Sequence, residues 1–164
     1  MNYLDAVAVA SALGERLLVW GVIEDSDYAK EIEATSPPGT IDWRGFLPTS
    51  ELQRELRNCR ALLNTPKWNE AYGNVVVEAM ACGVPVIAYD RGGPGELLTP
   101  GVTGLVVPPD DIAAMTQAVS IVGKIDRRAC REWVEGSASY DGFARRVESW
   151  IKKGIKAKSS SLAV

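Results

Sequence analysis

Two glutamates, Glu70 and Glu78, stand eight positions apart, with Gly73 between them. The residues from Asn74 onward are expected to form a helix, whose first N–H groups and positive dipole end suit a phosphate. Gly73 lets a ligand approach the backbone closely because it has no side chain. Two carboxylates do not bind a phosphate, so we interpret them as acceptors for the hydroxyls of a vicinal diol. The spacing predicts a site for a phosphorylated, polyhydroxylated ligand such as a nucleotide sugar.

A glycine-rich loop, Gly92-Gly93-Pro94-Gly95, follows another expected strand and would face this site. Each feature taken singly has an ordinary explanation. Glu70 could be a loop acid, Glu78 an acid on an exposed helix face, and the glycines a plain turn before a helix cap. The combination of paired acids, a helix start and a facing glycine loop favours the ligand site.

Strand-like and helix-like segments alternate along the chain, which predicts an α/β fold with a Rossmann-like parallel sheet covered by helices on both faces. In such sheets, ligands bind beyond the carboxyl ends of the strands. These are the loops after Phe46, Asn64 and Tyr89. The expected strands are 16–22, 41–46, 60–64, 85–89 and 104–107, and the expected helices are 4–13, 26–34, 50–58, 74–82, 96–98, 110–122, 126–136 and 140–153.

The segment 74–82 contains three consecutive valines, Val75-Val76-Val77, whose β-branched side chains disfavour a helix. We still predict a helix there, since Glu78-Ala79-Met80-Ala81 continues it and Gly83 ends it. The expected organisation is one nucleotide-sugar-binding domain over residues 1–153, followed by a disordered tail over 154–164.

Composition excludes several chemistries. The 164 residues include no histidine, which rules out His-based triads, acid–base catalysis by imidazole and His-ligated zinc. The three cysteines stand far apart, so neither a zinc site nor a redox pair is expected, and they indicate a reducing, cytoplasmic location. No leader and no membrane span are apparent.

Charge is unevenly distributed. Residues 121–164 hold 10 of the 18 basic side chains but only 5 of the 21 acidic ones. This basic end could touch an anionic membrane surface, although a solvated helix face explains it as well. The acidic pI of about 5.1 argues against nucleic-acid binding.

The run EAYGNVVVEAMACGVPVIAYDRGGPGELLTPGVTGLVVPPDD resembles the C-terminal, donor-binding domain of GT-B glycosyltransferases, specifically the retaining family 4 group (glycosyl transferases group 1). The specific features are the paired glutamates, the E-A-M-A-C-G-x-P-V passage, the G-G-x-x-E loop and the later T-G-L-V-V segment. The resemblance extends over residues 1–150. It implies transfer of a hexosyl group from a UDP-, GDP- or ADP-sugar to an acceptor hydroxyl, with retention at the anomeric carbon and without a metal or other cofactor.

The resemblance also implies roles for individual residues. Glu70 would position the transferred sugar as the catalytic-site carboxylate, and Glu78 would hold the ribose diol. Trp68 could gate the pocket or simply pack. Four backbone amides would face the sugar and diphosphate, those of Tyr72, Gly73, Asn74 and Val75. The wall opposite them would be formed by Gly92, Gly93 and Glu96. The base pocket would be lined by Arg44, Gly45, Phe46 and Leu47, unless these residues are an ordinary strand end.

Family members have a second, acceptor-binding domain and a first strand in the middle of the donor-domain sheet, and this sequence contains neither. We therefore expect a gap in the sheet, filled by another chain or by rearrangement, and an isolated chain that is inactive. Two alternatives remain. One is a non-catalytic nucleotide-sugar-binding remnant, and the other is a nucleotide-sugar epimerase or phosphorylase of related fold, which the lack of histidine disfavours.

Overall fold

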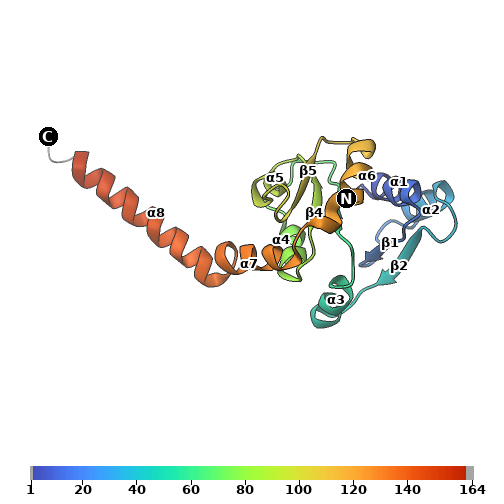
Figure 1. Cartoon of the computed structure of the whole chain (residues 1–164), viewed down its shortest axis with the longest axis horizontal. Helices are drawn as coiled ribbons and strands as arrows, with labels where there is room; N and C mark the ends of the chain where they lie inside the picture. The colour runs from blue at the N-terminus through green and yellow to red at the C-terminus, as the bar shows by residue number, and fades with distance from the viewer. Residues whose placement is uncertain (1, 162–164) are drawn as a thin grey trace.

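The protein is described here by a computed structural model, which defines the backbone of residues 2–161 and the side chains of residues 2–155. Helices and strands alternate over most of this range (Figure 1). The strands are β1 (Leu17–Trp20), β2 (Ile41–Gly45), β3 (Leu62–Asn64), β4 (Val86–Tyr89) and β5 (Gly104–Val107). The helices are α1 (Tyr3–Leu13), α2 (Ser26–Thr35), α3 (Thr49–Leu56), α4 (Asn74–Ala81), α5 (Gly93–Leu97), α6 (Ile112–Ile121), α7 (Arg127–Ser137) and α8 (Tyr140–Ser161), with a 3-10 turn, η1 (Val122–Lys124), after α6.

The strands form two separate parallel sheets. β1 pairs with β2, with Leu18 opposite Asp42. β3, β4 and β5 form a three-stranded sheet in that order, with Ile87 of β4 opposite Leu63 and Leu105. All pairs are parallel, so the carboxyl ends of the strands within each sheet lie at one edge. The predicted α/β class with a parallel sheet is confirmed, and the expected gap appears as the break between β1 and β3.

Helices α4 and α6 contact β4, and each packs against a second helix. α4 packs against α7, and α6 packs against α1. The hydrophobic core surrounds β4, whose four residues are fully buried, and includes Val76 and Met80 of α4 and Met115 of α6. The β-branched start of α4 is helical as predicted, and burial of Val76 in this core offsets its low helix preference.

The helix ends follow local signals in part. Gly14 ends α1 in the left-handed conformation, with φ of 66°, where the expected helix 4–13 stops. The cap of α2 is Asp25, whose carboxylate accepts the N–H groups of Asp27 and Tyr28, with Ser26 as the first helical residue. α8 continues to Ser161, past the end expected near Lys153. Residues 162–164 of the expected tail lie outside the described residues.

One expectation for β1 is wrong. The apolar run 16–22 predicts a buried strand, yet all four residues of β1 are only half-buried. Burial falls short because β1 has a strand neighbour on one edge only, whereas β4 has one on each edge. The open edge of β1 faces a cavity that is described below.

Tyr89 links the core to α1. Its hydroxyl donates to Asp5 Oδ2 at 2.7 Å. Burial raises the pKa of the Tyr89 phenol above its ordinary value, and the hydrogen bond to Asp5 raises it further. A raised folded-state pKa means that stability is complete below the unfolded-state value of about 10 and falls as pH rises above it.

We therefore expect wild-type protein to lose stability above about pH 10, and Tyr89→Phe to lose less. Urea unfolding at a series of pH values measures this. Tyr140→Phe is the matched control, because Tyr140 is 95% exposed and has no such contact. The same alkaline slope in wild type and Tyr89→Phe would contradict the assignment.

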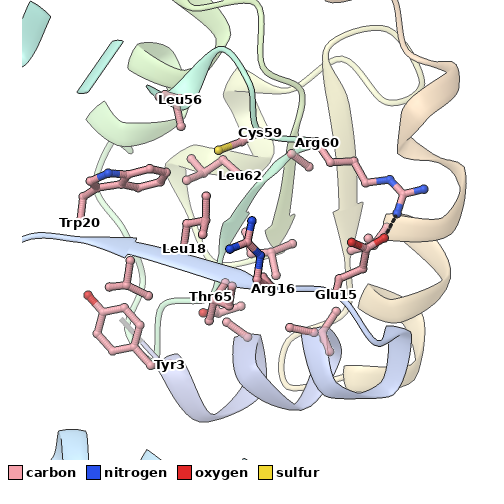
Figure 2. A pocket seen from close by; sticks show the side chains of 18 of the residues that line it. Tyr3, Glu15, Arg16, Leu18, Trp20, Leu56, Cys59, Arg60, Leu62 and Thr65 are labelled. Carbon is pink, nitrogen blue, oxygen red and sulfur yellow. Dashed lines mark hydrogen bonds and ion pairs between the residues drawn. The ribbon is translucent and has the colours of Figure 1, made fainter. Parts of the chain in front are cut away.

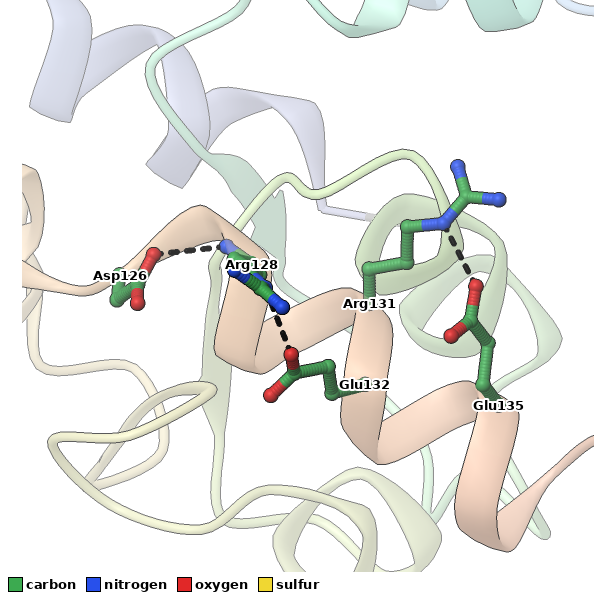
Figure 3. Close-up of polar contacts among 5 residues, drawn as sticks. All are labelled: Asp126, Arg128, Arg131, Glu132 and Glu135. Carbon is green, nitrogen blue, oxygen red and sulfur yellow. Dashed lines mark hydrogen bonds and ion pairs between the residues drawn. The ribbon is translucent and has the colours of Figure 1, made fainter.

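The carboxyl-terminal helices carry the basic end of the chain. On α7, Asp126 Oδ1 caps the helix by accepting the Arg128 N–H, and ion pairs join Arg128 to Glu132 and Arg131 to Glu135, each at 2.8 Å (Figure 3). α8 extends away from the rest of the chain (Figure 1). Among the described residues, no helix is both long enough and apolar enough to span a membrane.

Candidate functional site

A row of free amides begins α4. Gly73 is the N-cap residue, in the left-handed conformation with φ of 95°. Its carbonyl accepts the N–H groups of Val76 and Val77. Within residues 2–161, no acceptor takes the N–H groups of Tyr72, Gly73, Asn74 or Val75. We call these four groups the amide cradle. Consecutive unpaired N–H groups at a helix start form an anion-binding arrangement.

The two glutamates flank the amide cradle along the chain. Glu70 is half-buried, and Glu78 is exposed on α4. In the described part of the chain, neither carboxylate accepts a hydrogen bond or forms an ion pair. Both are therefore free to accept hydroxyl groups of a ligand.

The two glutamates have different surroundings. The backbone of Glu70 pairs with the glycine loop, because its N–H donates to Arg91 O at 3.0 Å and its carbonyl accepts the Gly93 N–H at 2.8 Å. Glu78 lines the cavity between the sheets, together with Val75. Glu70 is thus fixed against the 92–95 loop, whereas Glu78 faces the open edges of β1 and β3.

The glycines of the facing loop allow close packing of backbone on backbone. A Cβ on Gly93 would lie 2.5 Å from Tyr72 O and 2.6 Å from Tyr72 Cα. A Cβ on Gly92 would meet Glu70 O, and Gly92 also has a positive φ of 79°. Both glycines are therefore required to hold the 70–73 segment in place, a packing role that precedes any contact with a ligand.

Arg91 is a site-organising residue that the sequence analysis missed. Its guanidinium donates to Lys67 O at 2.7 Å and pairs with Asp110, so it ties the 65–73 loop to the end of β5. The signal available in the sequence was an arginine directly before the glycine pair. Trp68, in the loop that Arg91 holds, is 54% exposed and does not close over the site.

The expected base-pocket segment lies in the other sheet. Arg44 and Gly45 end β2, and the Arg44 guanidinium pairs with Asp42 at 2.9 Å. Phe46 is 76% exposed. Among the described residues, no hydrogen bond joins residues 44–47 to the 65–73 loop. Phe46, Trp68 and Tyr72 are exposed aromatic side chains in the segments that follow the carboxyl ends of β2 and β3.

A cavity of about 650 Å³ separates the two sheets (Figure 2). We call it the inter-sheet cavity. β1 and β3 form its sides, and residues of α1, α3 and α4 also line it. Cys59 contributes its thiol, and burial raises the pKa of that thiol. The described side chains include no cluster of three or more Cys, Asp or Glu that could hold a metal ion.

The first residues of α1 are fixed at the carboxyl end of β3. The Asn2 N–H donates to Thr65 O at 2.7 Å, and the Thr65 hydroxyl donates to Asn2 O at 2.8 Å. Both residues are buried. These two bonds join the start of α1, which packs against β1, to the carboxyl end of β3. The loop from this end of β3 leads to the amide cradle.

The chain is similar in sequence to known glycosyltransferases. The family model described as "Glycosyl transferases group 1" matches residues 14–137. D-inositol 3-phosphate glycosyltransferase of Mycolicibacterium smegmatis is 32% identical over 160 residues, which are 93% of this chain and 36% of that protein. An alpha-1,3/1,6-mannosyltransferase of Neurospora crassa is 35% identical over 139 residues, 78% of this chain and 29% of that protein. The chain thus spans about a third of these relatives.

Solved structures show the same fold. Sucrose-phosphate synthase from Thermosynechococcus elongatus superposes with a TM-score of 0.73 at 23% identity, covering 94% of this chain and 42% of that one. HepE of Anabaena in complex with UDP superposes with a TM-score of 0.70 at 20% identity, covering 94% and 44%. The predicted fold is confirmed by these likenesses.

Proposed function

The chain belongs to the glycosyl transferases group 1 family, which has the GT-B fold, and on this premise we propose that it is the donor-binding half of a retaining family 4 glycosyltransferase. The donor is a nucleoside diphosphate hexose. The observation that carries the proposal is the amide cradle, with its four unpaired N–H groups between two carboxylates that have no partner in the described chain.

The amide cradle binds the diphosphate. Charge grows on the leaving diphosphate as the bond to the sugar breaks. N–H groups already fixed at the start of α4 stabilise that charge without reorganising, so they contribute more in the transition state than in the ground state. Gly73 allows the chain to enter α4 with a φ of 95°, a conformation that side chains disfavour, and a Cβ there would crowd Pro94 at 3.2 Å.

The two carboxylates accept hydrogen bonds from different hydroxyl groups of the donor. Glu78 accepts both hydrogens of the ribose diol, and Glu70 accepts hydroxyls of the hexose and orients its anomeric carbon. The different surroundings of the two residues support separate roles. The segment Arg44, Gly45, Phe46 and Leu47 contributes to the base pocket, with the exposed Phe46 ring as the surface for the base.

Acceptor binding is assigned to another part of the enzyme. The chain spans about a third of the curated relatives described above, and sugar transfer needs an acceptor hydroxyl facing the donor. We therefore expect the isolated chain to be inactive in transfer while it retains donor binding. The free thiols of Cys59, Cys82 and Cys130 favour a reducing compartment, and the proposal includes a cytoplasmic location.

Thermal unfolding with UDP, GDP and ADP, followed by the sugars linked to the best of these, tests the proposal. A nucleotide present at 100 times its dissociation constant should stabilise the protein by about 2.7 kcal/mol. The nucleoside of the best nucleotide, without phosphates, is the control ligand, because it cannot bind the amide cradle. Equal stabilisation by the best of these nucleoside diphosphates and by its own nucleoside, or none by any nucleoside diphosphate at millimolar concentration, would contradict donor binding.

A further inference from the structure

The helix α8 carries an apolar stripe that the rest of the described chain does not cover. It extends away from the sheets, and α7 is the helix against which it packs (Figure 1). Gly142 keeps this contact close, because a Cβ there would lie 2.6 Å from Gly136 O. Five exposed apolar side chains share one face of α8, and we call them the α8 stripe: Tyr140, Phe143, Val147, Trp150 and Ile151.

The aromatic members of the α8 stripe are far from buried. Phe143 is 59% exposed and Trp150 is 75% exposed, and neither belongs to the hydrophobic core around β4. A contiguous exposed apolar surface marks a site of interaction. At about 100° per residue, the α8 stripe occupies one continuous arc of the helix, and polar side chains occupy most of the rest. A helix with one apolar face and one strongly charged face is typical of helices that lie in a membrane interface.

Four cations accompany the α8 stripe. Arg146 and Lys153 follow one edge of it. Arg145 and Lys152 lie farther round, on the polar face. Of these four, Lys152 alone forms an ion pair with a residue that the structure describes, Glu148 at 2.5 Å. Long cationic side chains beside an apolar face reach the level of lipid headgroups while their stems stay on apolar surface. The remaining cations indicate an anionic partner.

The two cations of the polar face favour a membrane over a protein as that partner. A protein that covered the α8 stripe would leave Arg145 and Lys152 on the solvated side, where they would contribute little. An anionic bilayer attracts them too, because a helix is about 10 Å across and the Debye length is about 8–10 Å. A second copy is disfavoured, since pairing two α8 stripes would bring like charges together.

The charge of the whole chain is arranged in the same sense. Residues 1–120 hold 8 basic and 16 acidic side chains, whereas residues 121–164 hold 10 basic and 5 acidic ones. An anionic surface repels the first part and attracts the second. Because α8 extends away from the sheets (Figure 1), it can lie on such a surface while the acidic part of the chain stays off it.

We propose that α8 lies in the plane of an anionic lipid membrane, with the α8 stripe at the boundary between headgroups and acyl chains. Arg146 and Lys153 lie at the level of the lipid phosphates. Burial of the apolar side chains and attraction of the cations both contribute, so binding is peripheral, reversible and weakened by salt. This surface is separate from the amide cradle, and the proposal does not rest on donor binding.

Sedimentation with lipid vesicles tests the proposal. The complete chain should bind vesicles of phosphatidylcholine mixed with phosphatidylglycerol at low salt. It should bind pure phosphatidylcholine vesicles at least about tenfold more weakly, because these lack the negative surface potential. Raising the salt to about 0.5 M should weaken binding to the anionic vesicles to a similar degree, since the charges are then screened.

Neutralising the bordering cations measures their contribution. Arg146→Gln combined with Lys153→Gln should weaken binding to the anionic vesicles about 30-fold. Arg54→Gln combined with Arg57→Gln is the matched control, because it removes two exposed cations at the end of α3 and changes the net charge equally. The control should weaken binding less than about twofold. Equal loss in both double variants would overturn the proposal.

A lipid label reports whether the α8 stripe enters the membrane. Lipids with brominated acyl chains quench tryptophan on contact, and Trp150→Phe assigns the quenching to one of the five tryptophans. Wild type should be quenched, and Trp150→Phe should still bind while losing the quenching. Phe143→Gln combined with Trp150→Gln should weaken binding more than about tenfold. Its melting temperature should not change, because these side chains lie outside the core and glutamine favours a helix.

Several results would overturn the proposal. One is absence of binding to the anionic vesicles at low salt, and another is unchanged binding by the Phe143→Gln, Trp150→Gln variant. Self-association without lipid that this variant abolishes would assign the α8 stripe to a second copy. Binding to soluble poly-glutamate as tight as that to vesicles, and lost in the same variant, would assign it to an acidic protein.

Discussion

Glu78→Ala should weaken binding of nucleoside diphosphates about 30-fold or more. The carboxylate is exposed on α4, has no partner in the described chain, and is assigned to both hydroxyls of the ribose. A hydrogen bond to a charged group contributes roughly 1.5–3 kcal/mol, and about 1.4 kcal/mol corresponds to a factor of ten. Isothermal titration with wild type and variant measures the loss. The melting temperature without ligand should not fall, because alanine is the best helix former.

Two companion variants separate ribose binding from sugar binding. Glu70→Ala should leave the affinity for the free nucleoside diphosphate nearly unchanged and remove the discrimination between it and the nucleotide sugar. Glu31→Ala removes an exposed acid of α2 and should change neither affinity. If Glu70→Ala and Glu78→Ala weakened free nucleotide to the same degree, the separate roles of the two acids would be wrong.

Gly93→Ala is expected to disrupt the site even though it adds a single methyl group. The new Cβ would lie 2.5 Å from Tyr72 O, and backbone atoms cannot rotate away as a side chain can. The 70–73 segment must therefore move, breaking the Gly93 N–H bond to Glu70 O and displacing the amide cradle. We expect a loss of about 1–3 kcal/mol in stability, typical of overpacking. Nucleotide affinity should fall by more than about tenfold.

Gly136→Ala is the matched control for this prediction. Gly136 lies inside α7, and nothing stands within 4 Å of its added Cβ. Alanine there should leave nucleotide affinity unchanged and stabilise the helix by up to about 1 kcal/mol. Urea unfolding and nucleotide titration of both variants provide the measurements. Wild-type stability and affinity in Gly93→Ala would show that the close approach of the two loops does not hold the site.

Local sequence patterns predicted most of the elements, because their signals are short in range. Apolar runs and glycine stops located β4, β5 and the end of α1 within a residue or two. The helix 74–82 was predicted against the preference of three valines, because Glu78-Ala79-Met80-Ala81 continues it and Gly83 ends it; the structure has it at Asn74–Ala81. The helix start expected at Asn74 likewise predicted free amides there, and the structure shows them.

Tertiary structure alone decided the features that depend on distant contacts. The tie from Arg91 to Lys67 and Asp110, and the bond from Tyr89 to Asp5, join residues whose separation leaves no periodic signal. The half-buried state of β1 was mispredicted for the same reason. An apolar run shows that a strand tends to be buried, but burial also requires a neighbour on each edge. By itself, the sequence determined which segments are strands, and it predicts which residues would contact a nucleotide sugar; three-dimensional packing determined that β1 and β3 stand apart with a cavity between them.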